Sequence, residues 1–118
     1  MLVLDDDPDI LKLLGMCLAS EGCAVRTASD TTDALTQIEG VDVAIVDQRM
    51  PVMSGTEFIQ AARAHHATAR FVVISGRREI RDEAIAAGAD TFLLKPISAR
   101  ELLLVVERLF SAGPVRPA

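Results

Sequence analysis

Residues 43–47 read Val-Ala-Ile-Val-Asp, an uninterrupted apolar run that ends in a carboxylate. Such a run is typical of a strand that is buried on both faces of a parallel sheet. Two similar runs follow, at 71–74 (Phe-Val-Val-Ile) and at 91–94 (Thr-Phe-Leu-Leu). The segments between these runs are long enough for a helix, so the pattern predicts strands that alternate with helices.

The first part of the chain shows the same alternation. A short apolar run ends at Leu4, and Asp7 followed by Pro8 is typical of the N-cap and first turn of a helix. Along the whole chain, strands are expected at 1–4, 24–28, 43–46, 71–74 and 91–94. Helices are expected from Asp7 to Glu21, from Ser29 or Asp30 to Gly40, from Thr56 to Ala64, in the segment that ends near Gly88, and from Ser98 through Leu109.

This succession predicts an α/β domain. Five strand–helix units within 118 residues indicate an open parallel sheet with helices on both faces. Right-handed crossovers leave few topologies for such a sheet. Sites in these folds lie at the carboxyl ends of the strands, so the residues that follow each strand are the candidates for function.

Composition excludes several classes of function. The chain is 50% hydrophobic and 25% charged, which is typical of a globular protein. Its formal charge of -5 disfavours direct binding of nucleic acid, which usually needs a basic surface. No apolar run approaches the roughly 18 residues of a membrane helix, and no signal peptide is visible. Two cysteines without metal-ligand spacing indicate free thiols, so we expect a cytoplasmic domain without membrane contact.

Charged and polar side chains follow four of the expected strands. They are Asp5, Asp6 and Asp7 after the first strand, Asp47 after the third, Ser75 and Gly76 after the fourth, and Lys95 after the fifth. Carboxylates that are held together repel one another, and Mg²⁺ relieves this repulsion because it prefers oxygen ligands. An Asp can act as a nucleophile and form an aspartyl phosphate, which a metal, a lysine and a hydroxyl stabilise electrostatically.

The chain carries an ordered set of motifs at these positions. They are Val3-Leu4-Asp5-Asp6-Asp7, Val46-Asp47, Met50-Pro51, Gly55, Ile74-Ser75-Gly76 and Lys95-Pro96. Together they resemble the receiver domain of bacterial response regulators, over nearly the whole chain from Met1 to Phe110. Each motif is weak alone, but the combination is specific. The resemblance implies a flavodoxin-like (βα)5 sandwich whose parallel strands are ordered 2-1-3-4-5.

The resemblance also implies a phosphorylation site. Asp47 is expected to accept a phosphoryl group from the phosphohistidine of a histidine kinase or a phosphotransfer protein. The expected Mg²⁺ ligands are Asp6 directly, Asp5 through water, Asp47 itself and the backbone carbonyl of Arg49. The domain would be a signalling switch rather than an enzyme, although it assists its own phosphorylation and slow dephosphorylation.

Further residues take roles through the same resemblance. Lys95, Ser75 and Gly76 are expected to contact the phosphate, and the Lys95–Pro96 peptide bond is expected to be cis. Ser75 and Phe92 are expected to move inward as a switch, which changes the surface of the fourth helix, fifth strand and fifth helix. That surface is expected to contact a second receiver or an attached output domain.

Some residues depart from the usual family pattern or allow a simpler interpretation. Gly76 replaces the more frequent Ala, and Phe92, which replaces Tyr, is also compatible with an ordinary core position. We hypothesise that Arg49 and Arg77, each two residues beyond a site residue, tune the lifetime of the phosphate. Asp7 is most simply explained as a helix cap.

Two other functions compete with the receiver. A haloacid-dehalogenase-like phosphatase would use Asp5 as nucleophile and Asp7 as acid/base, but it would need a later acidic pair and leaves Asp47 without a role. A phosphorylation-independent interaction module would usually lack one of the acids or the lysine. The domain is expected at 1–112, with 113–118 as a tail or linker of a longer regulator, and His65 and His66 are expected to be solvated.

Overall fold

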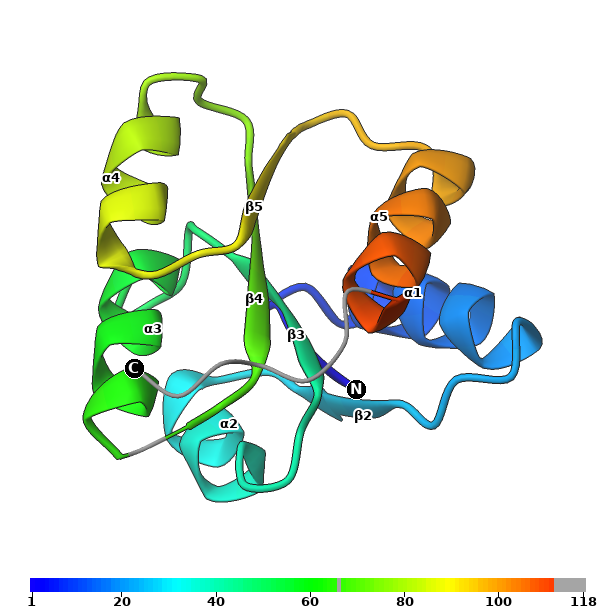
Figure 1. The fold of residues 1–118 in the computed structure, drawn as a ribbon, viewed down its shortest axis with the longest axis horizontal. Coiled ribbons are helices and arrows are strands. Elements are labelled where there is room, and N and C mark those ends of the chain that lie inside the picture. Colours follow the sequence, from blue (N-terminus) through cyan, green and yellow to red (C-terminus); the bar gives the residue numbers. More distant parts are fainter. Residues whose placement is uncertain (66, 112–118) are drawn as a thin grey trace.

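The computed structural model describes residues 1–65 and 67–111, which form a parallel sheet of strand order β2-β1-β3-β4-β5 with helices on both faces (Figure 1). The fold is the predicted flavodoxin-like one. The strands are β1 (Leu2–Leu4), β2 (Arg26–Ala28), β3 (Val43–Asp47), β4 (Arg70–Ser75) and β5 (Thr91–Leu94). The helices are α1 (Pro8–Ser20), α2 (Thr31–Gln37), α3 (Gly55–Ala64), α4 (Ile80–Ala87) and α5 (Ala99–Ser111). The predictions for His66 and for 113–118 lie outside the described residues.

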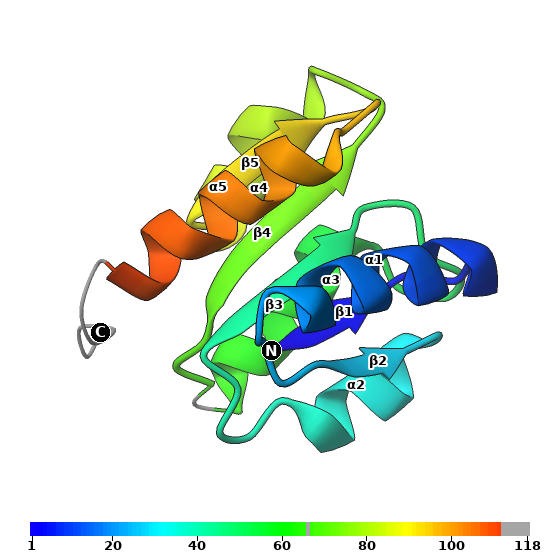
Figure 2. The ribbon, with the colours of Figure 1, turned by 90° about the vertical axis from the view of Figure 1, so that its right-hand side faces the viewer.

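The sheet separates two apolar layers. Helices α1 and α5 cover one face, and α2, α3 and α4 cover the other (Figures 1 and 2). Because side chains alternate along a strand, Val43 and Ile45 of β3 join the layer beneath α1 and α5, while Ala44 and Val46 join the opposite layer. This double burial explains why β3 is apolar throughout, up to the carboxylate at its end.

Helix caps follow the local sequence closely. The Asp7 side chain accepts a hydrogen bond from the Asp9 N–H, and Asp30 does the same for Asp33, so both predicted caps are confirmed. The Ser98 hydroxyl oxygen accepts the N–H of Glu101 at 3.1 Å, as expected for the start of α5. These caps satisfy main-chain donors that have no partner within their own helix.

Several predicted boundaries were wrong. The strand expected at 24–28 begins only at Arg26, because its partner β1 begins at Leu2, which pairs with Arg26. Helix α3 begins at Gly55 rather than Thr56, because Ser54 and Glu57 form a reciprocal capping box. Strand β3 ends one residue later than expected because Asp47 pairs with Ile74. Strand β4 is longer at both ends, because Arg70 pairs with Val43 and Ser75 pairs with Leu94 of β5.

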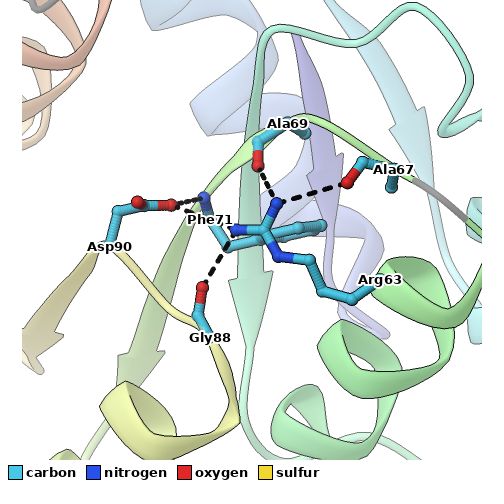
Figure 3. A network of polar contacts seen from close by, with 6 residues as sticks. All are labelled: Arg63, Ala67, Ala69, Phe71, Gly88 and Asp90. Carbon is cyan, nitrogen blue, oxygen red and sulfur yellow. Dashed lines mark hydrogen bonds and ion pairs between the residues drawn. The ribbon is translucent and has the colours of Figure 1, made fainter. Parts of the chain in front are cut away.

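A network around Arg63 joins the elements at the amino ends of β4 and β5 (Figure 3). The guanidinium donates hydrogen bonds to the carbonyls of Ala69 at 2.9 Å and Gly88 at 3.1 Å, and it lies 4.7 Å from the ring centroid of Phe71. It also forms an ion pair of 3.5 Å with Asp90, whose carboxylate accepts the Phe71 N–H. One side chain thereby ties α3 to the turns that enter β4 and β5.

None of the helices within the described residues combines the length and the apolar character needed to cross a membrane. His65 is exposed, as predicted. Both cysteines, Cys17 and Cys23, are free and only partly buried.

Candidate functional site

Three carboxylates from two segments of the chain converge at the carboxyl edge of the sheet. Asp5 and Asp6 follow β1, and Asp47 is the last residue of β3. One oxygen of each lies within 4.8 Å of the others. Asp5 and Asp47 are each only 6% exposed, whereas Asp6 is exposed. The pairing of β1 with β3 brings these residues together, as the parallel topology predicts.

The Asp5 carboxylate is buried beside two other acids. Burial raises the pKa of its carboxyl above the ordinary 3.8, and the charges of Asp47 and Asp6 raise it further. The Asp7 N–H, which donates to the Asp5 carboxylate at 2.9 Å, and Lys95 oppose this rise in pKa. The cluster therefore holds more negative charge than its own surroundings neutralise.

The Asp47 carboxylate has one cation beside it. The Lys95 ammonium lies 3.1 Å from Asp47 Oδ1, and the Lys95 side chain is 44% exposed. The approach is not aligned as a hydrogen bond, and among the described residues no group donates one to Oδ1, although this oxygen is buried. A buried carboxylate oxygen without a donor is costly unless a cation or a proton accompanies it.

The donor set therefore fits a divalent metal ion. Asp5, Asp6 and Asp47 supply closely spaced carboxylate oxygens, the ligands that Mg²⁺ prefers. Asp47, whose buried Oδ1 lacks a hydrogen-bond donor among the described residues, is itself a member of this cluster. Asp47 lies within β3 and Asp5 directly follows β1, so a cation would meet a largely preformed site.

A hollow of about 520 Å³ lies beside Asp47. Ser75, Gly76, Lys95 and Arg49 are among the residues that line it. The Ser75 oxygen accepts the Arg77 N–H at 3.0 Å, which leaves the hydroxyl proton available to donate into the hollow. A methyl group added at Gly76 would meet nothing within 4 Å, so Ala, the residue more usual in the family, would also fit there.

The other predicted residues lie near this edge. Phe92 is half-buried and packs against the core layer beneath α2, α3 and α4, so it is a core residue at the least. The Lys95–Pro96 peptide bond is cis, as the resemblance implies. Asp7 is exposed and caps α1, an arrangement that gives no support to the acid/base role it would have in a phosphatase.

The sequence interpretation missed Gln48, which follows Asp47. Its side-chain oxygen accepts the Thr56 N–H at 3.0 Å, and its amide nitrogen lies 3.4 Å from the Thr56 hydroxyl. No local pattern reveals this contact, because it joins a strand end to a helix that begins several residues later. The capping box at Ser54, in contrast, has a recognisable sequence signature.

Comparisons with known proteins identify relatives over almost the whole chain. A family model described as the response regulator receiver domain matches residues 1–107. The transcriptional regulatory protein PrrA of Mycobacterium leprae is 35% identical over 113 residues, which make up 92% of this chain and 48% of PrrA. GlrR of Escherichia coli is 32% identical over 111 residues, or 91% of this chain and 25% of GlrR.

Solved structures agree with these matches. The receiver domain of NtrX from Brucella abortus superposes with a TM-score of 0.87 at 32% identity, over 95% of this chain and 98% of that one. The chemotaxis protein CheY4 of Vibrio cholerae gives a TM-score of 0.84 at 32% identity, over 92% and 95% of the two chains. This chain spans about half the length of PrrA and a quarter of GlrR.

Proposed function

The chain belongs to the response regulator receiver domain family, and we propose that it is a phosphoacceptor switch in which Asp47 takes a phosphoryl group from a phosphohistidine. The observation that carries this proposal is Asp47 itself, which clusters with two further acids, has Lys95 3.1 Å from its Oδ1, and buries that oxygen without a hydrogen-bond donor among the described residues. Family members are signalling domains rather than classical enzymes. The donor of the phosphoryl group would be a histidine kinase or a phosphotransfer protein.

The residues of the site divide the chemistry among them. An Asp47 oxygen attacks phosphorus as the N–P bond of the donor breaks, and the electron pair of that bond remains on the imidazole nitrogen. Asp5, Asp6, Asp47 and the Arg49 carbonyl would hold Mg²⁺, which would neutralise charge on the phosphoryl group when bound. Lys95 and the Ser75 hydroxyl would bind the phosphate oxygens, with the main chain at Gly76 beside them.

The phosphorylated state would differ from the free state in charge near α4. A phosphoryl group adds roughly -1.5 to -2 charges and strong acceptor oxygens. Ser75 would turn toward it, and Phe92 would follow into the space that Ser75 leaves. The surface of α4, β5 and α5 would then favour a second receiver or an output domain over its resting contacts.

The chain adds its own features to this scheme. Arg77, whose side chain pairs with Glu79 at 2.9 Å, and Arg49 both line the hollow beside Asp47. We expect them to tune the lifetime of the phosphate by controlling how water reaches it. We expect the domain to act in the cytoplasm. We do not expect it to contact a membrane or nucleic acid itself.

The proposal predicts that acetyl phosphate with Mg²⁺ phosphorylates the wild type but not Asp47→Asn. Intact-protein mass spectrometry measures the added group, and peptide mapping after borohydride reduction places it. Lys95→Ala is expected to reduce labelling strongly, whereas Arg49→Ala and Arg77→Ala are expected to be labelled but to lose the phosphate at altered rates.

A phosphate retained by Asp47→Asn would contradict the proposal. Continuous turnover of a phosphomonoester that depends on Asp5 would instead support the phosphatase alternative. Equal labelling of the wild type and Asp47→Asn at background level would support an interaction module that needs no phosphorylation.

A further inference from the structure

Gln48 connects the phosphoacceptor to the start of α3 through both its main chain and its side chain. Its carbonyl accepts the N–H of Gly55 at 3.0 Å, and its side-chain oxygen accepts the N–H of Thr56 at 3.0 Å. The third N–H of the helix, that of Glu57, goes to the N-cap hydroxyl of Ser54 at 3.2 Å. Gln48 therefore satisfies two main-chain donors that α3 cannot satisfy itself.

The contact is two-sided and closely packed. The Gln48 amide nitrogen donates to the Thr56 hydroxyl at 3.4 Å, and that hydroxyl also lies 3.0 Å from the Ser54 hydroxyl. Thr56 is only 4% exposed, so these groups have little water to replace a lost partner. Gln48, at the start of the loop between Asp47 and α3, thus bonds directly to Gly55 and Thr56 at the loop's other end.

Gly55 shows how near the helix lies to the phosphoacceptor. A Cβ at this position would come within 2.7 Å of the Asp47 carbonyl oxygen and 3.0 Å of the Gln48 Cα. Both are main-chain atoms, which cannot move aside cheaply. The first turn of α3 therefore rests directly on the peptide that joins Asp47 to Gln48, and only glycine permits this approach.

We infer that Gln48 is a positioning residue for the metal and phosphate site. Gln48 borders the hollow beside Asp47, but both polar atoms of its side chain are bonded to Thr56, so we assign it no direct contact with the metal or the phosphate. It holds the main chain between Asp47 and Arg49 against α3, and this segment carries the nucleophile and the expected carbonyl ligand. The inference rests on the proposed function, because it assigns Gln48 a role in the geometry of that same site. Residues that orient metal ligands commonly affect metal affinity even though they are not ligands.

The test measures Mg²⁺ affinity and stability separately. Calorimetric titration with Mg²⁺ alone suits this chain, which has no Trp or Tyr for intrinsic fluorescence. Gln48→Met keeps the shape of the side chain but removes both hydrogen bonds, and we expect its Mg²⁺ dissociation constant to rise about tenfold. Thr56→Val removes the hydroxyl contacts with Gln48 and Ser54 but keeps the Thr56 N–H bond to Gln48, and it is expected to weaken Mg²⁺ binding about threefold. Thr56→Ser keeps both contacts and should bind Mg²⁺ as the wild type does.

The control is Asp30→Ala, which removes the cap of α2 away from the hollow. It should lower thermal stability without changing Mg²⁺ affinity. Mg²⁺ binding by Gln48→Met within twofold of the wild type would overturn the inference, because a merely structural role lowers only stability. If Gln48→Met does not fold, the same criterion applies to Thr56→Val.

The two proposals fail in different ways. A wild type that binds no Mg²⁺ and accepts no phosphoryl group would overturn the proposed function and this inference with it. A wild type that is labelled at Asp47, together with a Gln48→Met variant of unchanged Mg²⁺ affinity, would overturn the positioning role alone.

Discussion

The two ends of the sheet differ in whether their charged side chains have partners. At the amino ends of β4 and β5, the Arg63 guanidinium has main-chain carbonyls, an aromatic ring and Asp90 around it (Figure 3). At the carboxyl ends, Asp5, Asp6 and Asp47 face one partly exposed lysine, and a buried oxygen of Asp47 lacks a donor. Every group of the first end has a partner, whereas the second has Lys95 as a partly exposed counter-charge and would be neutralised further by a bound cation.

This difference separates stability from function. A closed network contributes to the folded state under all conditions, because each of its groups has a partner. The cluster of Asp5, Asp6 and Asp47 (the open end) lowers stability while its charges repel one another. A bound metal or phosphate relieves that repulsion, which makes binding favourable. Substitutions at the two ends should therefore change stability in opposite directions.

The largest effect on stability is expected at the amino ends of β4 and β5, where the Arg63 network lies (the closed end). Arg63→Ala should lower the free energy of unfolding by about 3 kcal/mol, because several carbonyls and a carboxylate lose their donor together. Urea denaturation followed by circular dichroism measures this loss. Mg²⁺ affinity should stay unchanged, since the network lies at the other end of the sheet.

The exposed ion pair of Arg77 and Glu79 supplies the matched control for Arg63. Its side chains are 69% and 64% exposed, against 32% and 31% for Arg63 and Asp90. Arg77→Ala should therefore cost at most about 0.5 kcal/mol. Equal losses for Arg63→Ala and Arg77→Ala would show that the network contributes no more than a surface pair.

At the open end, Asp5→Asn is expected to stabilise the metal-free protein at neutral pH, on the order of 1 kcal/mol. The folded-state pKa of Asp5 is raised, so the folded protein holds this proton more tightly than the unfolded chain does. Ionised Asp5 thus destabilises the fold at neutral pH, and this cost disappears as the pH falls through the raised pKa toward 3.8.

The stability of wild type and Asp5→Asn, measured across this pH range, tests that prediction. The difference between the two should shrink in acid, and Mg²⁺ should stabilise the wild type more than the variant. A constant difference with pH would mean that the Asp5 charge is not its cause.

The smallest effect is expected at Val52, in the loop beside the open end. Val52 has a φ of 71° and is fully exposed at 101%, within a tight turn in which the Met53 N–H donates to the Pro51 carbonyl at 2.7 Å. A β-branched residue is strained in this conformation. Val52→Gly should relieve the strain but add freedom to the unfolded chain, for a net gain of about 0.5 kcal/mol.

Thermal unfolding measures the Val52→Gly effect, with Val52→Ala as the control that keeps most of the strain. A loss of stability in Val52→Gly larger than in Val52→Ala would show that the turn is not strained. Backbone strain at Val52 would then not be a further difference between the end of the sheet that carries Asp47 and the end that carries the Arg63 network.

The order of strands and helices followed from the sequence, because apolar runs and caps are local signals. The gathering of Asp5, Asp6, Asp47, Ser75 and Lys95 also followed, since parallel strands bring their carboxyl ends to one edge. The boundary at Arg26 did not, because it depends on where the partner strand β1 begins. The start of α3 at Gly55 was missed even though its capping box, Ser54 with Glu57, has a sequence signature.

Only the tertiary structure decided how these parts touch. The amide of Gln48 meets Thr56 across 8 positions of sequence, and Arg63 meets Gly88 across 25, so neither contact leaves a local pattern. The same holds for the Asp47 oxygen, which is buried yet lacks a donor. The sequence by itself determined which chemical groups are present and at which edge. Packing determined which of these groups have a hydrogen-bond or ion-pair partner, because such contacts need segments that are distant in sequence to come within a few ångströms.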